Sequence, residues 1–200
     1  MTDATSHAEK MKVQQAAHRK RVKAASTPDR GLVLVYTGEG KGKSSSAFGV
    51  IVRALGWGQR VGVVQFIKGT WKTGERQFFA NFEGRIDWHT MGEGFTWDTQ
   101  DLERDTATAQ AAFRKAREML ESGGYDLVVL DEINIALRYD YLSEEAVLEG
   151  LEARSPRTSV ILTGRDAKPA LCEYADLVSE MHAIKHPFDA GIKAVRGIDF

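Results

Sequence analysis

One segment near the amino terminus constrains the fold of this chain more than any other. An apolar, β-branched run at Leu32–Tyr36 is followed by the glycine-rich string TGEGKGKS at residues 37–44, and then by a segment of helical period, Lys43–Leu55. A buried strand, a tight turn and a helix in this order are typical of the first unit of a parallel sheet. We therefore expect an α/β protein with a mostly parallel sheet flanked by helices.

The rest of the chain repeats this alternation. Strands buried on both faces are predicted for short β-branched runs, and weaker strands for two further segments; together these are Leu32–Tyr36, Gly62–Ile67, Leu127–Leu130 and Ser159–Leu162, with Ile86–Thr90 and Leu177–Ala183. Helices are predicted at Lys43–Leu55, Leu102–Leu120 and Glu144–Arg154, the last with Ser143 as its N-cap. One domain over residues 31–200 accommodates all of these elements.

Residues 1–30 are chemically distinct from that domain. They hold seven Lys and Arg against three Asp and Glu, a net of +4, which leaves −5 for the remainder of a chain whose total is −1. Their Ala, Gln, Lys and Arg content favours a helix exposed on most faces. A frayed basic arm and a segment that becomes ordered against a ligand or a second subunit are both compatible with this composition.

The overall composition excludes several classes of function. A net charge of −1 provides no general field for binding nucleic acid or an acidic membrane surface. Neither a membrane span nor a secretory signal is expected, and the single Cys172 fits a reducing cytoplasm, where we expect the protein to be located.

The glycine-rich string, here called the phosphate loop (residues 37–44), predicts a binding site for nucleotide phosphates. Its glycines allow backbone N–H groups to turn toward phosphate oxygens, Lys43 can reach between phosphates, and the Ser44 hydroxyl can bind Mg²⁺. One position departs from the pattern G-x-x-x-x-G-K-[ST], since Thr37 replaces the first glycine. A glycine-rich turn with solvated lysines is the less favoured alternative. The expected nucleotide-binding residues are Gly38, Glu39, Gly40, Lys41, Gly42, Lys43, Ser44 and Ser45.

Two carboxylates, Asp131 and Glu132, follow the strand predicted at Leu127–Leu130. We expect them at the carboxyl edge of the sheet, next to the phosphate loop, where they and Ser44 would bind Mg²⁺ directly or through water. A plain structural role for these two carboxylates is the alternative. A zinc site at His182 and His186 is not expected, because no cysteine or carboxylate lies at zinc spacing. Arg165 is expected to contact a phosphate or to form a surface salt bridge.

The sequence as a whole resembles the ATP:corrinoid adenosyltransferases of the bacterial cobalamin pathway, the family with the P-loop fold. The resemblance begins with Thr37–Arg76, covers almost the whole chain, and continues through GFTWDTQD (94–101), VVLDEIN (128–134), ILTGRDA (161–167), ADLVSEM (175–181) and KHPFDAGIKAVRGIDF (185–200). Two positions differ from the pattern of that family. Glu39 stands where an Asn is expected, and Ser44, which keeps the hydroxyl, stands where a Thr is expected.

The resemblance implies transfer of the 5′-deoxyadenosyl group of ATP to the cobalt of a reduced Co(I) corrinoid, with release of triphosphate. It implies Mg²⁺ or Mn²⁺ as the metal ion and Lys43 as a catalytic residue. Phe95 and Trp97 would hold the corrinoid and exclude the lower axial ligand from cobalt. It also implies a homodimer in which the arm covers the site of the partner subunit, and a flavoprotein as electron donor.

Two other functions remain compatible with the motifs. A P-loop kinase or ATPase would use Lys43, Ser44 and Asp131 for phosphoryl transfer. An ATP-gated corrinoid carrier would bind both ligands without any chemical step.

Overall fold

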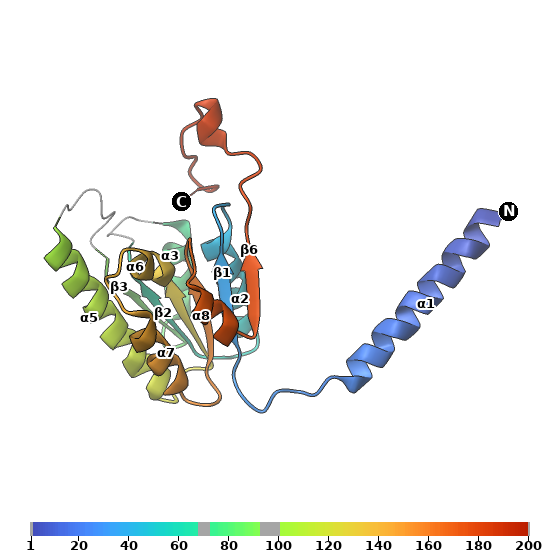
Figure 1. Ribbon diagram of the computed structural model, residues 1–200, viewed down its shortest axis with the longest axis horizontal. Coiled ribbons are helices and arrows are strands. Elements are labelled where there is room, and N and C mark those ends of the chain that lie inside the picture. The colour runs from blue at the N-terminus through green and yellow to red at the C-terminus, as the bar shows by residue number, and fades with distance from the viewer. Residues whose placement is uncertain (1, 68–72, 93–100, 200) are drawn as a thin grey trace.

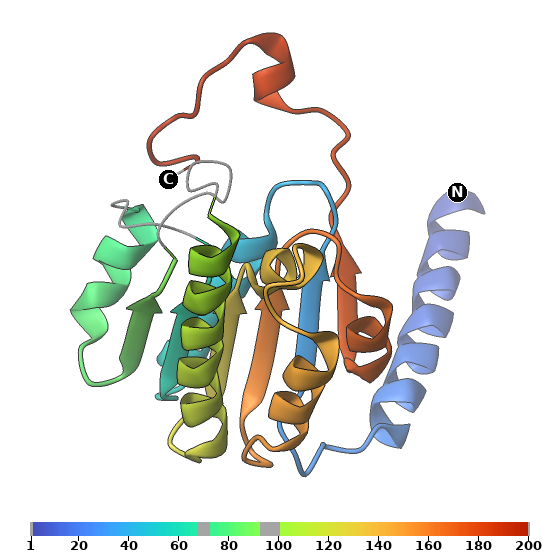
Figure 2. The same cartoon turned by 60° about the vertical axis from the view of Figure 1, so that its left-hand side comes forward.

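A parallel sheet forms the centre of the computed structural model, which describes residues 2–67, 73–92 and 101–199. Within those residues the sheet has six strands in the order β3-β2-β4-β5-β1-β6, and every neighbouring pair is parallel. The strands are β1 (Val33–Thr37), β2 (Val61–Gln65), β3 (Ile86–Thr90), β4 (Leu127–Asp131), β5 (Ser159–Thr163) and β6 (Leu177–Glu180). All their carboxyl ends therefore lie at one edge of the sheet, which Figure 2 shows at the top.

Helices cover both faces of this sheet (Figures 1 and 2). The described helices are α1 (Thr2–Ala24), α2 (Lys43–Gly56), α3 (Gly74–Phe79), α5 (Leu102–Glu121), α6 (Ile133–Arg138), α7 (Glu144–Glu152) and α8 (Pro169–Tyr174), with 3₁₀ turns η1 (Ala80–Phe82) and η2 (Pro187–Ala190). Helices α2 and α3 pack on one face, whereas α5, α6, α7 and α8 pack on the other. The predicted α/β class, with helices flanking a parallel sheet, is confirmed.

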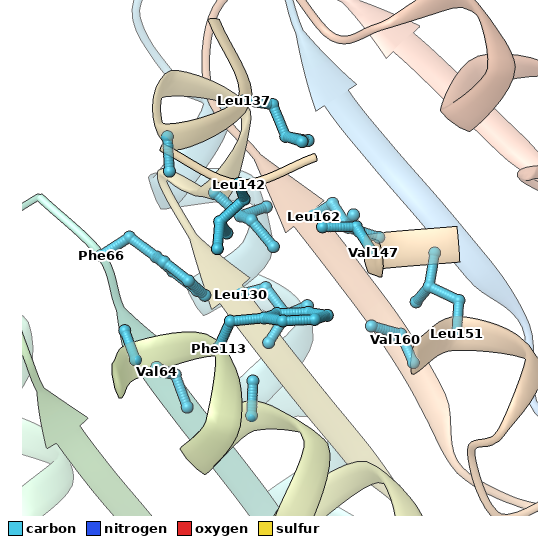
Figure 3. Close-up of a cluster of buried hydrophobic side chains, with 14 of the residues drawn as sticks. Val64, Phe66, Phe113, Leu130, Leu137, Leu142, Val147, Leu151, Val160 and Leu162 are labelled. Carbon is cyan, nitrogen blue, oxygen red and sulfur yellow. The ribbon is translucent and has the colours of Figure 1, made fainter. Parts of the chain in front are cut away.

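The core is divided between the two faces by the alternation of side chains along each strand. Leu130 and Leu162 belong to the cluster beneath α5 and α7, which Figure 3 shows around Phe113 and Leu151. The intervening Val129 belongs to the cluster beneath α2. Both faces of the central strands are therefore buried, as the continuous apolar runs predicted.

The predicted elements agree with the observed ones to within a few residues. The largest strand difference is at β6, which ends at Glu180 and not at Ala183. Ser143 is the N-cap of α7, where its Oγ accepts the N–H of Ala146 at 3.1 Å. The short helices α3, α6 and α8 were not predicted, because six residues are too few to show a helical period.

The basic arm forms the helix α1, which extends away from the sheet (Figure 1). Its described side chains, from His7 onward, are exposed. The guanidinium of Arg30 forms two hydrogen bonds with Asp176 at 2.8 and 2.5 Å, so the chain is attached to the domain immediately before β1. In the part of the chain described here, no helix is both long and apolar enough to cross a bilayer.

Candidate functional site

The phosphate loop connects β1 to α2 at the carboxyl edge of the sheet. Gly42 precedes α2 with a φ of 114°, a left-handed conformation that favours glycine. Gly42 has no side chain with which to cap α2, and the first backbone N–H groups of a helix point out of its N-terminus, here toward the loop. This arrangement of a glycine turn and a helix N-terminus is suited to binding phosphate.

The loop rests on the chain that follows β6. The N–H of Gly40 donates to the carbonyl of Met181 at 2.7 Å. Gly38 has a φ of 93°, and a Cβ there would lie 2.4 Å from the same carbonyl oxygen. The close approach of these two segments therefore requires glycine at position 38.

Lys43 lies across the inside of the loop. Its amine donates to the carbonyl oxygens of Gly38 at 2.8 Å and Gly40 at 2.6 Å, and the residue is 8% exposed. Burial lowers the pKa of this amine, and the nearby carboxylate of Glu132 opposes that change. The amine is thus positioned at the centre of the loop, where a phosphate oxygen could replace the carbonyls.

Two ion pairs flank the loop. Arg165 Nε lies 3.0 Å from Glu39 Oε2, so of its two expected roles the surface salt bridge is observed, with a residue of the loop itself. Lys41 Nζ lies 2.6 Å from Asp199 Oδ1. Asp199 belongs to the C-terminal segment, which passes over the carboxyl edge of the sheet in Figure 2. Side chains from three distant parts of the sequence therefore meet at the loop.

Asp131 and Glu132 lie at the carboxyl end of β4, as expected, but not beside β1. In the sheet, strand β5 lies between β4, which carries these two residues at its end, and β1, which leads into the phosphate loop. Glu132 nevertheless lies close enough for its carboxylate to favour a higher pKa of the Lys43 amine, against the larger effect of burial, and a Cβ at Gly164 would lie 3.3 Å from Glu132 Oε2. Glycine after β5 thus leaves room for the Glu132 side chain at the loop side of β4.

The Asp131 carboxylate is fully buried, in contrast to that of Glu132. Asp131 accepts hydrogen bonds from Gln65 Nε2 at 2.8 Å and from Thr163 Oγ1 at 2.9 Å. Thr163 Oγ1 also accepts the backbone N–H of Glu132 at 2.9 Å. The two adjacent acidic residues therefore have different surroundings, one within the sheet and one at its edge.

The donor set at this edge is compatible with a magnesium ion. Mg²⁺ prefers oxygen and usually keeps several waters, needing only one or two carboxylates together with substrate phosphates. The Ser44 hydroxyl and the Glu132 carboxylate are oxygen donors of this kind. Among the described residues there is no cluster of three or more His, Cys, Asp or Glu side chains that would hold a metal by themselves. A metal held jointly by protein and nucleotide fits this arrangement.

Comparison with known proteins identifies the family of this chain. The family model described as ATP:corrinoid adenosyltransferase BtuR/CobO/CobP matches residues 29–200. The chain belongs to the ATP:corrinoid adenosyltransferase family. A corrinoid adenosyltransferase of Pseudomonas aeruginosa is 50% identical to it over 194 residues, covering 97% of this chain and 95% of the relative. The corresponding protein of Escherichia coli K12 is 46% identical over 177 residues, covering 88% and 89%.

The aromatic loop of this adenosyltransferase (residues 91–101) is described only at its two ends. Phe95 and Trp97 lie outside the described residues. The loop leaves the sheet after β3, where the N–H groups of Met91 and Gly92 donate to the backbone carbonyl of Gln65 at 3.0 and 3.3 Å. It returns at Asp101, the N-cap of α5.

Three polar residues that contact the phosphate loop or Asp131 were not predicted from the sequence. Gln65 and Thr163 end β2 and β5, and Asp199 lies in the C-terminal segment. A polar residue that ends an otherwise apolar strand was a usable signal for the first two. Nothing local marked Asp199, because its contact with the loop depends on the course of the C-terminal segment.

Proposed function

We propose that this chain transfers the 5′-deoxyadenosyl group of ATP to the cobalt of a Co(I) corrinoid. The proposal rests on the family match over residues 29–200, with relatives that are named corrinoid adenosyltransferase. The phosphate loop and its buried lysine support the proposal, because they offer backbone N–H groups and an amine that can bind the phosphates of a nucleoside triphosphate.

The reaction forms a Co–C5′ bond and breaks the C5′–O bond of ATP. The electron pair of Co(I) attacks C5′, and triphosphate leaves with the electrons of the broken bond. Co(I) is already a strong nucleophile, so the protein needs no general base. Its main contributions are alignment of cobalt with C5′ and stabilisation of the negative charge that accumulates on triphosphate.

Residues of the phosphate loop would stabilise that leaving group. Lys43 would exchange its carbonyl contacts for phosphate oxygens, and Lys41 would exchange Asp199 for the same ligand. The first-turn N–H groups of α2 add the positive end of the helix dipole. Ser44 and Glu132 would hold Mg²⁺, with Asp131 behind them, and this ion would neutralise part of the triphosphate charge.

The aromatic loop would provide the corrinoid side of the site. Phe95 and Trp97 would cover the lower face of the corrin ring and keep the axial ligand and water away from cobalt. Removing that donor makes reduction of Co(II) to Co(I) easier, with a flavoprotein as the electron source. The exposed basic helix α1 would cover the site of the partner subunit in a homodimer.

A product analysis tests the proposal against its alternatives. The protein is incubated with ATP, Mg²⁺ and a chemically reduced corrinoid, and the products are separated by chromatography. Triphosphate and a light-sensitive alkylated corrinoid in equal amounts are expected. ADP or inorganic phosphate without alkylation would instead identify a kinase or ATPase, and tight binding of both ligands without products would identify a carrier. Lys43→Met is the matched negative control.

A further inference from the structure

A buried chain of hydrogen bonds crosses the carboxyl edge of the sheet from β2 to β5. Gln65 donates to Asp131 at 2.8 Å, Thr163 donates to the other oxygen of Asp131 at 2.9 Å, and Thr163 accepts the N–H of Glu132 at 2.9 Å. Asp131 and Thr163 are 0% exposed and Gln65 is 5% exposed. Buried polar networks with satisfied partners restrict their members to one arrangement.

At its β5 end, this series of hydrogen bonds stabilises an unusual backbone conformation. Glu132 has a φ of 66°, in the left-handed region that residues other than glycine rarely adopt. Such a conformation is strained and persists only where the surroundings hold it. The hydroxyl of Thr163 binds the N–H of this same residue, so it directly stabilises the turn that directs the Glu132 side chain.

At its β2 end, the series of hydrogen bonds reaches the first residues of the aromatic loop. Gln65 Oε1 accepts hydrogen bonds from Trp88 Nε1 at 2.9 Å and from Thr90 Oγ1 at 3.1 Å, both on β3. The backbone carbonyl of Gln65 accepts the N–H groups of Met91 and Gly92, where the loop begins. The side-chain amide and the backbone carbonyl of Gln65 thus connect β4 with β3 and with the start of the loop.

We infer that Gln65 and Thr163 are positioning residues of the adenosyl-transfer site. Through Asp131 they hold the Glu132 carboxylate in the orientation that meets the metal–triphosphate, and they fix the start of the aromatic loop relative to it. The inference rests on the proposed function for the reaction and the ligands. Asp131 then contributes through its neighbours within the sheet, while Glu132 contacts the metal.

Threonine variants of β5 test this role with a matched control. Thr163→Val removes the hydroxyl and nearly keeps the side-chain shape, whereas Thr163→Ser keeps the hydroxyl. Thr158→Val removes an equally buried hydroxyl just before β5, where Thr158 Oγ1 donates to the Tyr125 carbonyl at 2.8 Å, at the opposite edge of the sheet. Loss of a group that orients a metal ligand typically reduces metal affinity or activity about 10- to 100-fold.

Two readouts separate positioning from a general loss of stability. Thr163→Val should lower kcat about 10- to 100-fold and weaken Mn²⁺ binding in the presence of ATP, measured by electron paramagnetic resonance, to a similar extent. Thr163→Ser should lie within about threefold of the unsubstituted protein in both readouts. Thr158→Val should leave kcat and Mn²⁺ affinity unchanged, even if it lowers the Tm as much as Thr163→Val does. Equal kcat and Mn²⁺ affinity in Thr163→Val and Thr158→Val would overturn the inference.

Gln65→Met provides a second variant if Thr163→Val does not fold. It should weaken Mn²⁺ binding and raise the corrinoid KM, while the ATP KM changes by less than about threefold. Unchanged Mn²⁺ binding and corrinoid KM would also overturn the inference. Failure of the proposed function is distinguishable, because the unsubstituted protein would then form no alkylated corrinoid although Thr163→Val still weakened Mn²⁺ binding.

Discussion

We expect the ion pair between Arg30 and Asp176 to stabilise the protein at β1, the strand that leads to the phosphate loop. Asp176 also accepts the backbone N–H of Val33, the first residue of β1, at 2.9 Å. The Arg30 hydrogen bond, aided by that N–H, lowers the pKa of Asp176 from 3.8 to about 2, although partial burial opposes the change. Asp176→Asn removes the charge and keeps the shape, so it measures the contribution of the carboxylate.

The expected loss follows from the difference between the two pKa values. That difference corresponds to about 2.5 kcal/mol of unfolding free energy at neutral pH. Asp176 is 23% exposed and Arg30 is 48% exposed, so solvent screens the pair, and we expect about 1–1.5 kcal/mol. Urea denaturation of both proteins at pH 7 measures this loss.

The sign of the pH dependence provides a sharper test. A carboxylate whose pKa is depressed in the folded state stabilises the protein above its unfolded pKa, and this stabilisation is lost as the pH falls through the folded pKa. The difference between the two proteins should be constant from pH 7 to about pH 5 and fall to about half by pH 3. Glu118→Gln, in an exposed helical pair with Lys115, is the control and should cost less than about 0.5 kcal/mol. A difference that stayed constant down to pH 3 would refute the reasoning.

Three further predictions concern the site. Lys43→Met should lower adenosyl transfer at least about 100-fold, because a buried donor to the triphosphate is lost; ATP titration calorimetry should show weaker binding, and unchanged binding would argue against the role of the amine. Asp199→Asn should release Lys41 and tighten ATP binding about two- to fivefold at low salt, with no gain at high salt; a gain that persists at high salt would contradict an electrostatic origin. Phe95→Ala and Trp97→Ala should depress activity that starts from Co(II) more than activity that starts from prepared Co(I), measured side by side; equal losses in both assays would exclude their role in reduction.

Prediction from the sequence succeeded where the signal was local. The β-branched runs and the long helical periods located the six strands, α2, α5 and α7, because burial on both faces of a strand and along one face of a helix leaves a clear pattern. The phosphate loop was found from the spacing of three glycines and Lys43. The six-residue helices were missed, since their periods are too short. Gln65 and Thr163 were missed although each is a polar residue at the end of an apolar strand, because their spacing does not show that they meet.

Asp131 and Glu132 show most clearly what the sequence could not predict. The sequence alone placed both at a strand end, as a pair with one role beside the phosphate loop. The fold inserts β5 between β4 and β1, buries Asp131 against Gln65 and Thr163, and leaves Glu132 at the edge in a left-handed turn. Adjacent residues point to different sides of the chain, so only the neighbouring strands decide which carboxylate is enclosed.

By itself, the sequence determined the class of fold, the position of the glycine-rich loop between a strand and a helix, and the family, because these depend on hydrophobic period and on motifs of consecutive residues. Only the tertiary structure decided the order of the strands, the ion pairs of Glu39 with Arg165 and of Lys41 with Asp199, and the hydrogen-bond chain from Gln65 to Glu132. These features join residues that are 31 to more than 150 positions apart. Their formation depends on which strands become neighbours, and no local pattern encodes that choice.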